Sequence, residues 1–364
     1  MIPLFLRIGV EEGASPFVLR LNSDWRPGFV EHDAHVTRLT KGGAIYHSQR
    51  GELLVEYTDW KSLDRDVILV YPSKRLASRL IRSASIHNTL LLTEQCDQLC
   101  EMCSQPPKAH HSDMFEYLEL AVSLAPMGAR IGLSGGEPTL FKEQLFDLVR
   151  RTLVNRPDLS FHILTNGQHF THSDIPFVRA IPRGRVLWGV PLYSSNSTAH
   201  DEIVGKSGAF ARLQESFSIL MRGNAEIELR TVVLNSNVAD LEVTAEFISL
   251  KLPFVERWAI MQLERIGFGR KNWNRLFFDN SRTFSPIARA IDTAMGLGIQ
   301  TQLYNFPLCT IPEEYREQAP RTISDWKQKY LDTCTGCRLL DTCSGFFEWY
   351  DQSNGYSKLG LQPL

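Results

Sequence analysis

Hydrophobic and polar positions along the chain follow two kinds of pattern. From about residue 87 onward, short apolar runs alternate with amphipathic stretches, and six of these runs have the length and composition of strands: HNTLLLT (87–93), ARIGLS (129–134), SFHILT (160–165), RVLWGVPL (185–192), EIELRTVVL (226–234) and RWAIMQL (257–263). Between them, apolar residues recur at three- and four-residue steps, as at Phe210, Leu213 and Phe217, which predicts helices. Alternating strands and helices predict an α/β fold with a parallel sheet.

Six strands, each followed by a helix, are compatible with two architectures. We predict a partial TIM barrel of six βα units, and the alternative is an open, doubly wound sheet. In both architectures the ligand site lies at the carboxyl ends of the strands. The residues that directly follow each strand are therefore the first candidates for binding and chemistry.

The two ends of the chain have other patterns. Runs such as FVLRL (17–21), ELLVEY (52–57) and DVILVY (66–71) are separated by polar, glycine-containing turns, which predicts a small β-rich N-terminal domain. A free strand edge there is expected to pair with a peptide, and the alternative is that the domain only covers the barrel. The predicted organisation is a β-rich domain at 1–85, the partial barrel at 86–305 and a C-terminal extension at 306–364.

Composition and charge remove several function classes. Hydrophobic residues make up 43% and charged residues 22% of the chain, and 41 acids against 39 bases give a formal charge of −2. With so little net charge and no basic run, no nucleic-acid partner is expected. The start of the chain lacks the architecture of a signal peptide, and no stretch reaches the roughly 18 apolar residues of a membrane helix. We expect a cytoplasmic protein with no membrane partner.

The seven cysteines fall into two groups, and the first group lies within one short segment. Cys96, Cys100 and Cys103 stand in a C-x3-C-x2-C spacing directly after the first predicted strand. Thiols in a reducing compartment are more often metal ligands or catalytic groups than disulfide partners. Three thiolates can hold three irons of a cubic iron–sulfur cluster and leave the fourth iron open to another ligand. The alternatives are a zinc knuckle or cysteines packed as small hydrophobic residues.

This spacing after the first strand resembles the radical S-adenosylmethionine (SAM) enzymes. In that family a glycine-rich segment at the end of the second strand meets the methionine end of SAM, and glycines let backbone groups approach a ligand closely. The corresponding positions here are Ser134, Gly135, Gly136, Glu137 and Pro138. The resemblance therefore implies that this segment binds SAM.

Two further positions are assigned by the same resemblance. Met102 stands where the family usually has an aromatic residue that touches adenine, and its polarizable sulfur can pack on a purine. Arg230 lies on the fifth predicted strand, where a polar or cationic side chain often meets the ribose or carboxylate of SAM. The alternatives for Arg230 are an ordinary salt bridge and a snorkelling arginine, whose stem is buried while its charged end reaches water.

The chemistry that the resemblance implies belongs largely to the cofactor. A reduced cluster passes one electron to SAM, and the resulting 5′-deoxyadenosyl radical takes a hydrogen atom from the substrate. This step needs no general base, and the sequence shows no convincing catalytic dyad, so no catalytic side chain is assigned. A one-electron reductant is an implied partner.

The second cysteine group lies more than 200 residues later. Cys334, Cys337 and Cys343 form a C-x2-C-x5-C spacing, and Cys309 precedes them. Four thiolates can saturate a second four-iron cluster or a structural zinc ion, and spacing alone does not separate these. The group resembles the auxiliary-cluster extension (SPASM/twitch-like) of radical SAM enzymes that modify peptides, which implies a second four-iron cluster.

Three phrases narrow the resemblance further. TEQCDQLCEMCSQPPK (93–108), VPLYSS (190–195) and NFPLC (305–309) are most similar to a radical SAM maturase of the His-Xaa-Ser system. This implies two [4Fe–4S] clusters and SAM as cofactors, a ribosomally made precursor peptide as substrate, and a second maturase protein as a candidate partner. The alternative functions are a radical SAM enzyme acting on a small molecule or RNA, or a non-catalytic metal-binding interaction module.

Overall fold

The computed structural model describes residues 2–10, 15–24, 31–357 and 360–364. The chain forms two compact units. The first consists of Met1–Leu92, Ser112–Ser134 and Glu143–His162, and the second of Thr93–His111, Gly135–Lys142 and Ile163–Leu364. The predicted boundaries after residues 85 and 305 lie inside these units and stay predictions.

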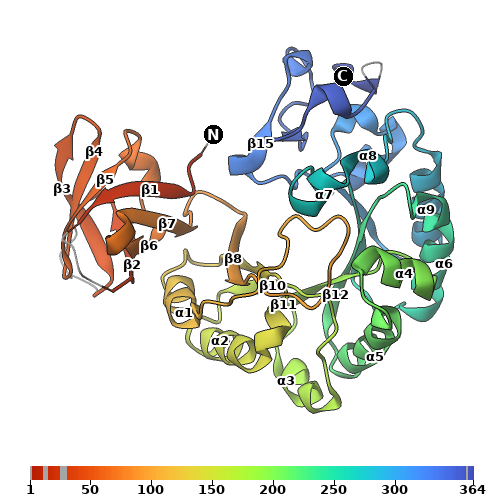
Figure 1. Ribbon diagram of the computed structural model, residues 1–364, viewed down its shortest axis with the longest axis horizontal. Coiled ribbons are helices and arrows are strands. Elements are labelled where there is room, and N and C mark those ends of the chain that lie inside the picture. Colours follow the sequence, from red (N-terminus) through yellow and green to blue (C-terminus); the bar gives the residue numbers. More distant parts are fainter. Residues whose placement is uncertain (1, 11–14, 25–30, 358–359) are drawn as a thin grey trace. The chain divides into compact units, whose positions relative to one another are not determined.

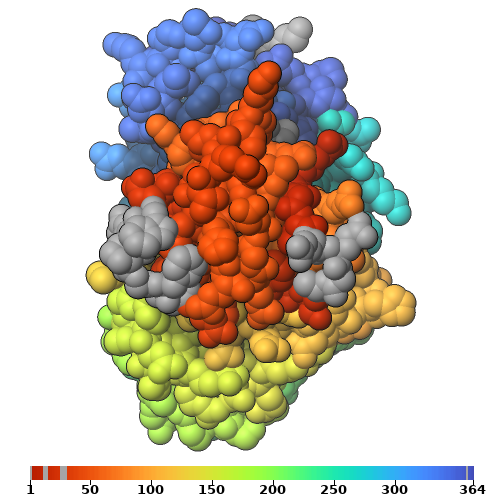
Figure 2. Space-filling model, turned by 90° about the vertical axis from the view of Figure 1, so that its left-hand side faces the viewer, coloured from red at the N-terminus to blue at the C-terminus, as the bar shows by residue number. Residues whose placement is uncertain are grey.

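The N-terminal strands form a closed barrel (Figure 1), whose residues gather as one red-to-orange group in Figure 2. The strands are β1 (Phe5–Gly9), β2 (Phe17–Asn22), β3 (Asp33–Thr40), β4 (Gly43–Ser48), β5 (Gly51–Glu56), β6 (Val67–Tyr71) and β7 (Leu76–Ile81). Their order is β1-β5-β4-β3-β2-β6-β7, with β2 and β3 parallel. Alternate residues such as Leu6, Ile8, Leu53 and Val55 are buried in its core. The expected free edge is wrong, because within the described residues every strand of the barrel has a neighbour on both sides.

A buried ion pair ties β7 to the segment before β6. The side chains of Asp66 and Arg79 are almost fully buried, and Arg79 Nε donates to Asp66 Oδ2 at 2.8 Å. The other carboxylate oxygen accepts the backbone N–H of Ser83 at 2.8 Å. Burial raises the pKa of Asp66, and the Arg79 charge opposes that rise. The carboxylate therefore depends on Arg79 for its charged form.

We expect Arg79→Met to destabilise the barrel by about 3–5 kcal/mol, because it leaves a buried carboxylate without its counter-charge. In the folded variant, burial keeps the pKa of Asp66 above its value in the unfolded chain. The folded variant therefore binds a proton more readily than the unfolded chain, and the free energy of unfolding falls as the pH rises above the unfolded pKa. Urea unfolding at pH 5 and pH 8 measures both effects. Arg38→Met, at an exposed position on β3, is the control. Equal stability of Arg79→Met and the control would contradict the prediction.

The remaining strands form the predicted parallel α/β sheet. They are β8 (Asn88–Thr93), β9 (Arg130–Gly135), β10 (Ser160–Leu164), β11 (Val186–Pro191), β12 (Glu226–Val232), β13 (Arg257–Met261) and β14 (Thr301–Tyr304). Their order in the sheet follows the chain from β8 to β14, and β11 through β14 pair in parallel. A doubly wound sheet would reverse its strand order at a switch point, so that alternative is wrong. The sheet has a seventh strand, β14, that the prediction of six units did not contain.

Helices follow the strands of this sheet. They are α1 (Phe115–Ser123), α2 (Lys142–Asn155), α3 (Ile175–Ala180), α4 (Ser197–Val204), α5 (Ala209–Arg222), α6 (Leu241–Lys251), α7 (Gly267–Lys271), α8 (Trp273–Leu276) and α9 (Ser285–Gly296). In the second unit, α5, α6 and α9 lie along the outside of the strands (Figure 1). The predicted apolar face of α5, with Phe210, Leu213 and Phe217, is buried. No helix of the described part of the chain has the length and apolar character needed to cross a membrane.

The C-terminal segment contains little regular structure. Its two short strands, β15 (Gln328–Lys329) and β16 (Phe346–Phe347), pair antiparallel. Phe346, Tyr350, Tyr356 and Leu361 form a buried cluster against which Cys309 and Cys334 pack. This cluster gives residues 306–364 a small core of their own.

Candidate metal and cofactor site

The first cysteine group lies on a loop that starts at the carboxyl end of β8. Backbone hydrogen bonds fix this loop to the end of α4, with Leu99 N donating to Val204 O at 3.0 Å and Glu101 N donating to Ile203 O at 2.9 Å. Phe268 N, at the start of α7, donates to Cys103 O at 2.8 Å. The loop is therefore held by contacts that involve none of its thiols.

The three thiols of this loop are half-buried and lie close enough to influence one another electrostatically. Burial raises the pKa of Cys96 to about 11, and it also raises the pKa of Cys100 and Cys103. The unliganded thiols are thus protonated at neutral pH, and a bound cation would be needed to hold them as thiolates. Among the described residues, no three His, Cys, Asp or Glu side chains converge as a site for a single metal ion.

A charged network that the sequence analysis missed surrounds Asp97, next to the first cysteine. Asn166 Nδ2 donates to Asp97 Oδ1 at 2.8 Å, His169 Nε2 lies 3.2 Å from Oδ2, and Lys206 pairs with the same oxygen. Burial works against the charge of Asp97, but these three partners hold its pKa well below the usual range. Asn166 is the second residue after β10, so the rule that ligands gather at the carboxyl ends of strands pointed to this position.

The glycine-rich segment lies against the entry to the cysteine loop. Gly136 N donates to Thr93 O and Glu137 N donates to Gln95 O, both at 2.7 Å. A Cβ on Gly135 would lie 2.3 Å from Thr93 O, and a Cβ on Gly136 would lie 2.0 Å from Gln95 O. Ser134 precedes this contact on β9, and Pro138 follows it in a buried 3-10 turn, Pro138–Phe141. Gly135 and Gly136 are therefore needed because the backbone here lies too close to the backbone of Thr93 and Gln95 to leave room for a Cβ atom.

The Glu137 side chain is fully buried and points into the protein. Its Oε1 accepts hydrogen bonds from Thr139 N at 2.8 Å and Thr165 Oγ1 at 2.6 Å, and its Oε2 accepts one from Asn166 N at 2.5 Å. Burial raises the pKa of Glu137, and these hydrogen bonds oppose the rise. The side chain joins the loops after β9 and β10, so any contact of this residue with a ligand would come from its backbone.

We expect Glu137→Gln to destabilise the fold by about 1–3 kcal/mol, because an amide nitrogen would then face a buried N–H donor. Urea unfolding followed by circular dichroism measures the change. Glu143→Gln, at an exposed position in the first turn of α2, is the matched control. A difference between the two variants below about 0.5 kcal/mol, the usual range for surface changes, would contradict the anchoring role.

Met102 is packed among hydrophobic side chains and is only 6% exposed. Its neighbours are Ile203, Leu234, Leu263, Trp273 and Leu276. This packing holds the cysteine loop against α4 and α8. A contact of Met102 with adenine would require the side chain to leave this cluster, and the predicted role stays a prediction.

Arg230 belongs to a polar cluster on β12 and β14. Its guanidinium pairs with Glu228 at 2.5 Å and lies 5.8 Å from the ring centroid of Tyr304, whose hydroxyl also donates to Glu228 at 2.9 Å. The salt bridge weighed as the alternative is therefore present. Burial raises the pKa of the Tyr193 hydroxyl, the thiols of the first cysteine group add to this rise, and the positive charge of Arg230 opposes it.

A second acid that the sequence analysis missed follows β13. Both carboxylate oxygens of Glu264 lie 3.4 Å from Lys327 Nζ, and Lys327 lies 5.0 Å from the centroid of Phe347. Burial raises the pKa of Glu264, and Lys327 opposes that rise. Arg265 pairs with Asp351 at 3.1 Å. These contacts fix the C-terminal segment to the carboxyl end of β13.

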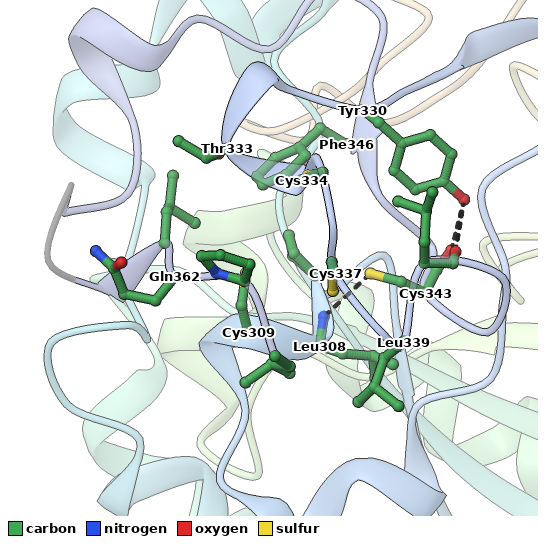
Figure 3. Close-up of a pocket in the computed structure, with 15 residues that line it drawn as sticks. Leu308, Cys309, Tyr330, Thr333, Cys334, Cys337, Leu339, Cys343, Phe346 and Gln362 are labelled. Atoms are coloured by element: carbon green, nitrogen blue, oxygen red, sulfur yellow. Dashed lines mark hydrogen bonds between the residues drawn. The ribbon is translucent and has the colours of Figure 1, made fainter.

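The four cysteines of the second group line one pocket with an open volume of about 400 Å³ (Figure 3). They come from the 3-10 turn Leu308–Thr310, the turn Asp332–Cys334 and the loop that leads to β16. Pro307, Tyr330, Leu339, Leu340 and Phe346 surround them. The structure therefore brings Cys309, Cys334, Cys337 and Cys343 together, as the sequence analysis grouped them.

Backbone donors already point at one of these sulfurs. Leu308 N and Gly345 N donate to Cys343 Sγ at 3.4 and 3.3 Å (Figure 3 shows the first). Burial raises the pKa of Cys343, and it raises the pKa of Cys309 to about 12, with the neighbouring thiols adding to the rise at Cys309. N–H donors directed at sulfur suit a site that holds thiolates rather than thiols.

Comparison with known proteins finds solved structures that are similar to this chain. The sequence matches no protein-family model, and no curated protein is similar to it in sequence. SuiB from Streptococcus suis bound to S-adenosylmethionine is similar with a TM-score of 0.49 and 12% identity, over 61% of this chain and 51% of that chain. SuiB bound to precursor peptide SuiA gives a TM-score of 0.49 and 13% identity, over 61% and 49%. A radical SAM methyltransferase from Sphaerobacter thermophilus gives a TM-score of 0.45 and 12% identity, over 74% and 76%. The chain spans about half the length of SuiB.

Proposed function

We propose that the chain is a radical SAM enzyme that modifies a ribosomally made peptide. The observation that carries this proposal is the group of three half-buried thiols on one anchored loop at the carboxyl end of β8. Three protein thiolates leave one iron of a cubic cluster without a protein ligand, which is where SAM would bind. When bound, the cluster, reduced by an external one-electron donor, and SAM would supply a 5′-deoxyadenosyl radical for hydrogen-atom abstraction from the substrate.

The residues around this loop suit the proposed cofactors. Cys96, Cys100 and Cys103 would hold the cluster, and the backbone of Gly135 and Gly136 would meet the methionine end of SAM. The chain's own work is to orient these groups and to keep water away from them. Arg230 would contribute a positive charge toward the SAM carboxylate or ribose, although Glu228 neutralises part of that charge.

For the second group we propose a fully ligated auxiliary [4Fe–4S] cluster. A tetrahedral zinc site keeps its sulfurs only about 3.8 Å apart, since each Zn–S bond is about 2.3 Å, whereas a four-iron cluster binds each thiolate to a different iron. The C-x2-C-x5-C spacing of Cys334, Cys337 and Cys343 resembles an auxiliary-cluster extension, which supports the larger group. With four protein ligands, this cluster would neither bind nor cleave SAM.

The peptide substrate is the finer part of the proposal. Its support is the resemblance of the C-terminal cysteine spacing and of the phrase at 93–108 to peptide maturases, among them a maturase of the His-Xaa-Ser system. A one-electron reductant and a second maturase protein are the proposed partners. A small-molecule substrate and a non-catalytic metal-binding module are the competing functions.

One preparation tests the proposal against these competitors. Anaerobically purified and reconstituted protein should contain close to eight irons and eight sulfides per chain with little zinc, and it should release 5′-deoxyadenosine from SAM when dithionite is added. A zinc-only protein that neither binds nor cleaves SAM would establish the interaction module instead. SAM cleavage that a panel of candidate precursor peptides does not stimulate, but a small molecule does, would remove the peptide substrate.

A further inference from the structure

We propose that Asn166 is a positioning residue for the cluster of the cysteine loop, and that its side-chain amide raises the reduction potential of this cluster by donating a hydrogen bond to the sulfur of Cys96. Asn166 Nδ2 lies 3.9 Å from Cys96 Sγ. This inference rests on the proposed function, because it concerns a cluster held by Cys96, Cys100 and Cys103. Asn166 follows β10, whereas the cysteine loop follows β8, so a second strand end would take part in setting the properties of the cluster.

The orientation of the amide is fixed by its other partners. Asn166 Oδ1 accepts the backbone N–H of Gln168 at 3.0 Å, and Nδ2 donates to Asp97 Oδ1 at 2.8 Å. In the flipped amide, the oxygen would face the Asp97 carboxylate and the nitrogen would face an N–H donor, so both contacts would be repulsive. One amide hydrogen is therefore directed to Asp97, and the other is free to be directed to Cys96.

The surroundings keep the amide in this place. The backbone N–H of Asn166 donates to the buried Glu137, and Gly167 N donates to Thr165 Oγ1 at 3.1 Å, which fixes the turn after β10. On the other side, His169 and Lys206 hold the second oxygen of Asp97. The Lys206 cation compensates the negative charge of Asp97, and the Asn166 amide is directed at the sulfur of Cys96.

The effect on a cluster follows from charge. Reduction adds one negative charge to the cluster and its sulfurs, so a hydrogen bond to a ligating sulfur stabilises the reduced form more than the oxidised form. A hydrogen bond to a charged group is worth about a factor of ten in an equilibrium constant, so loss of the amide should make reduction about tenfold less favourable.

Asn166→Leu tests this inference, because leucine has nearly the same shape and no donor, and Asn166→Ala is the second variant. We expect both to bind iron at the loop, with a midpoint potential about 59 mV lower in an EPR-monitored titration, which is a tenfold change for a one-electron couple. The auxiliary cluster in the same sample is the control, and its potential should not move. An unchanged potential of the loop cluster would overturn the inference and leave the proposed function intact.

Two other outcomes are also decisive. Wild-type protein without iron at the loop would refute the proposed function, and the inference would fall with it. If neither variant assembled the loop cluster, wild-type protein labelled with ¹⁵N-asparagine would decide the point through the hyperfine coupling of the reduced cluster to the Asn166 amide nitrogen. Detection of that coupling supports the hydrogen bond, and its absence overturns it.

Discussion

A variant with alanine at Cys96, Cys100 and Cys103 should form no 5′-deoxyadenosine from SAM and dithionite, while it keeps its iron at the C-terminal cysteines. The three thiols are the proposed ligands of the SAM-cleaving cluster, so their removal leaves SAM without an iron to bind. The loop itself should stay folded, because its anchors to Val204, Ile203 and Phe268 are backbone hydrogen bonds. Product analysis by chromatography, together with iron and sulfide quantification, measures both parts.

The control for this variant is Leu99→Ala, which changes a 61% exposed side chain of the same loop and no thiol. We expect it to retain four irons at the loop and to cleave SAM. Product formation by the triple variant would assign SAM cleavage to other residues. Loss of iron from both cysteine groups in the triple variant would contradict the independence of the two sites.

The second large effect is expected at the C-terminal pocket. Replacing Cys334 and Cys337 together with alanine should prevent binding of the proposed auxiliary cluster and make the segment from about residue 320 onward sensitive to proteases. The reason is that the four cysteines line one pocket together with Phe346, against which Tyr350 and Tyr356 pack. Without a metal group this pocket would be left open and apolar. Limited proteolysis with mass spectrometry locates the cuts, and iron analysis should show a loss of about half of the total.

Thr335→Ala provides the comparison for this experiment, because Thr335 is an exposed residue of the same loop. It should resemble the wild type in iron content and in protease resistance. SAM cleavage without peptide should survive in the double cysteine variant, since the first loop does not use these thiols. A double variant with full metal content would show that Cys334 and Cys337 are not ligands.

The parallel sheet could be predicted from the sequence because its strands are continuous apolar runs, such as RVLWGVPL, that no helix pattern interrupts. The strand β14 was missed because it has only four residues, Thr301–Tyr304, and two of them are polar. Closure of the N-terminal barrel was missed for another reason. It depends on which strands pair, as with the parallel pair β2 and β3, and periodicity carries no information about partners.

In the candidate site, residue types were predictable and their contacts were not. Gly135 and Gly136 were expected to make room for a ligand, but the nearest atoms to their missing side chains belong to Thr93 and Gln95. The buried state of Glu137 depends on Thr165 and Asn166, which come from another strand end. Met102 is covered by Trp273, which is 171 residues away in the sequence, since 273 − 102 = 171. Such contacts are properties of the tertiary fold.

The backbone anchors of the cysteine loop have a thermodynamic consequence for cofactor loading. Ordering a flexible loop costs about 1–2 kcal/mol of conformational entropy per residue, and a ligand that orders its own site loses that amount from its binding free energy. Here Val204, Ile203 and Phe268 hold the loop through backbone hydrogen bonds in which no thiol takes part. The proposed cluster would therefore bind to a loop whose backbone is anchored at three points, and less of its binding free energy would be lost to ordering the loop.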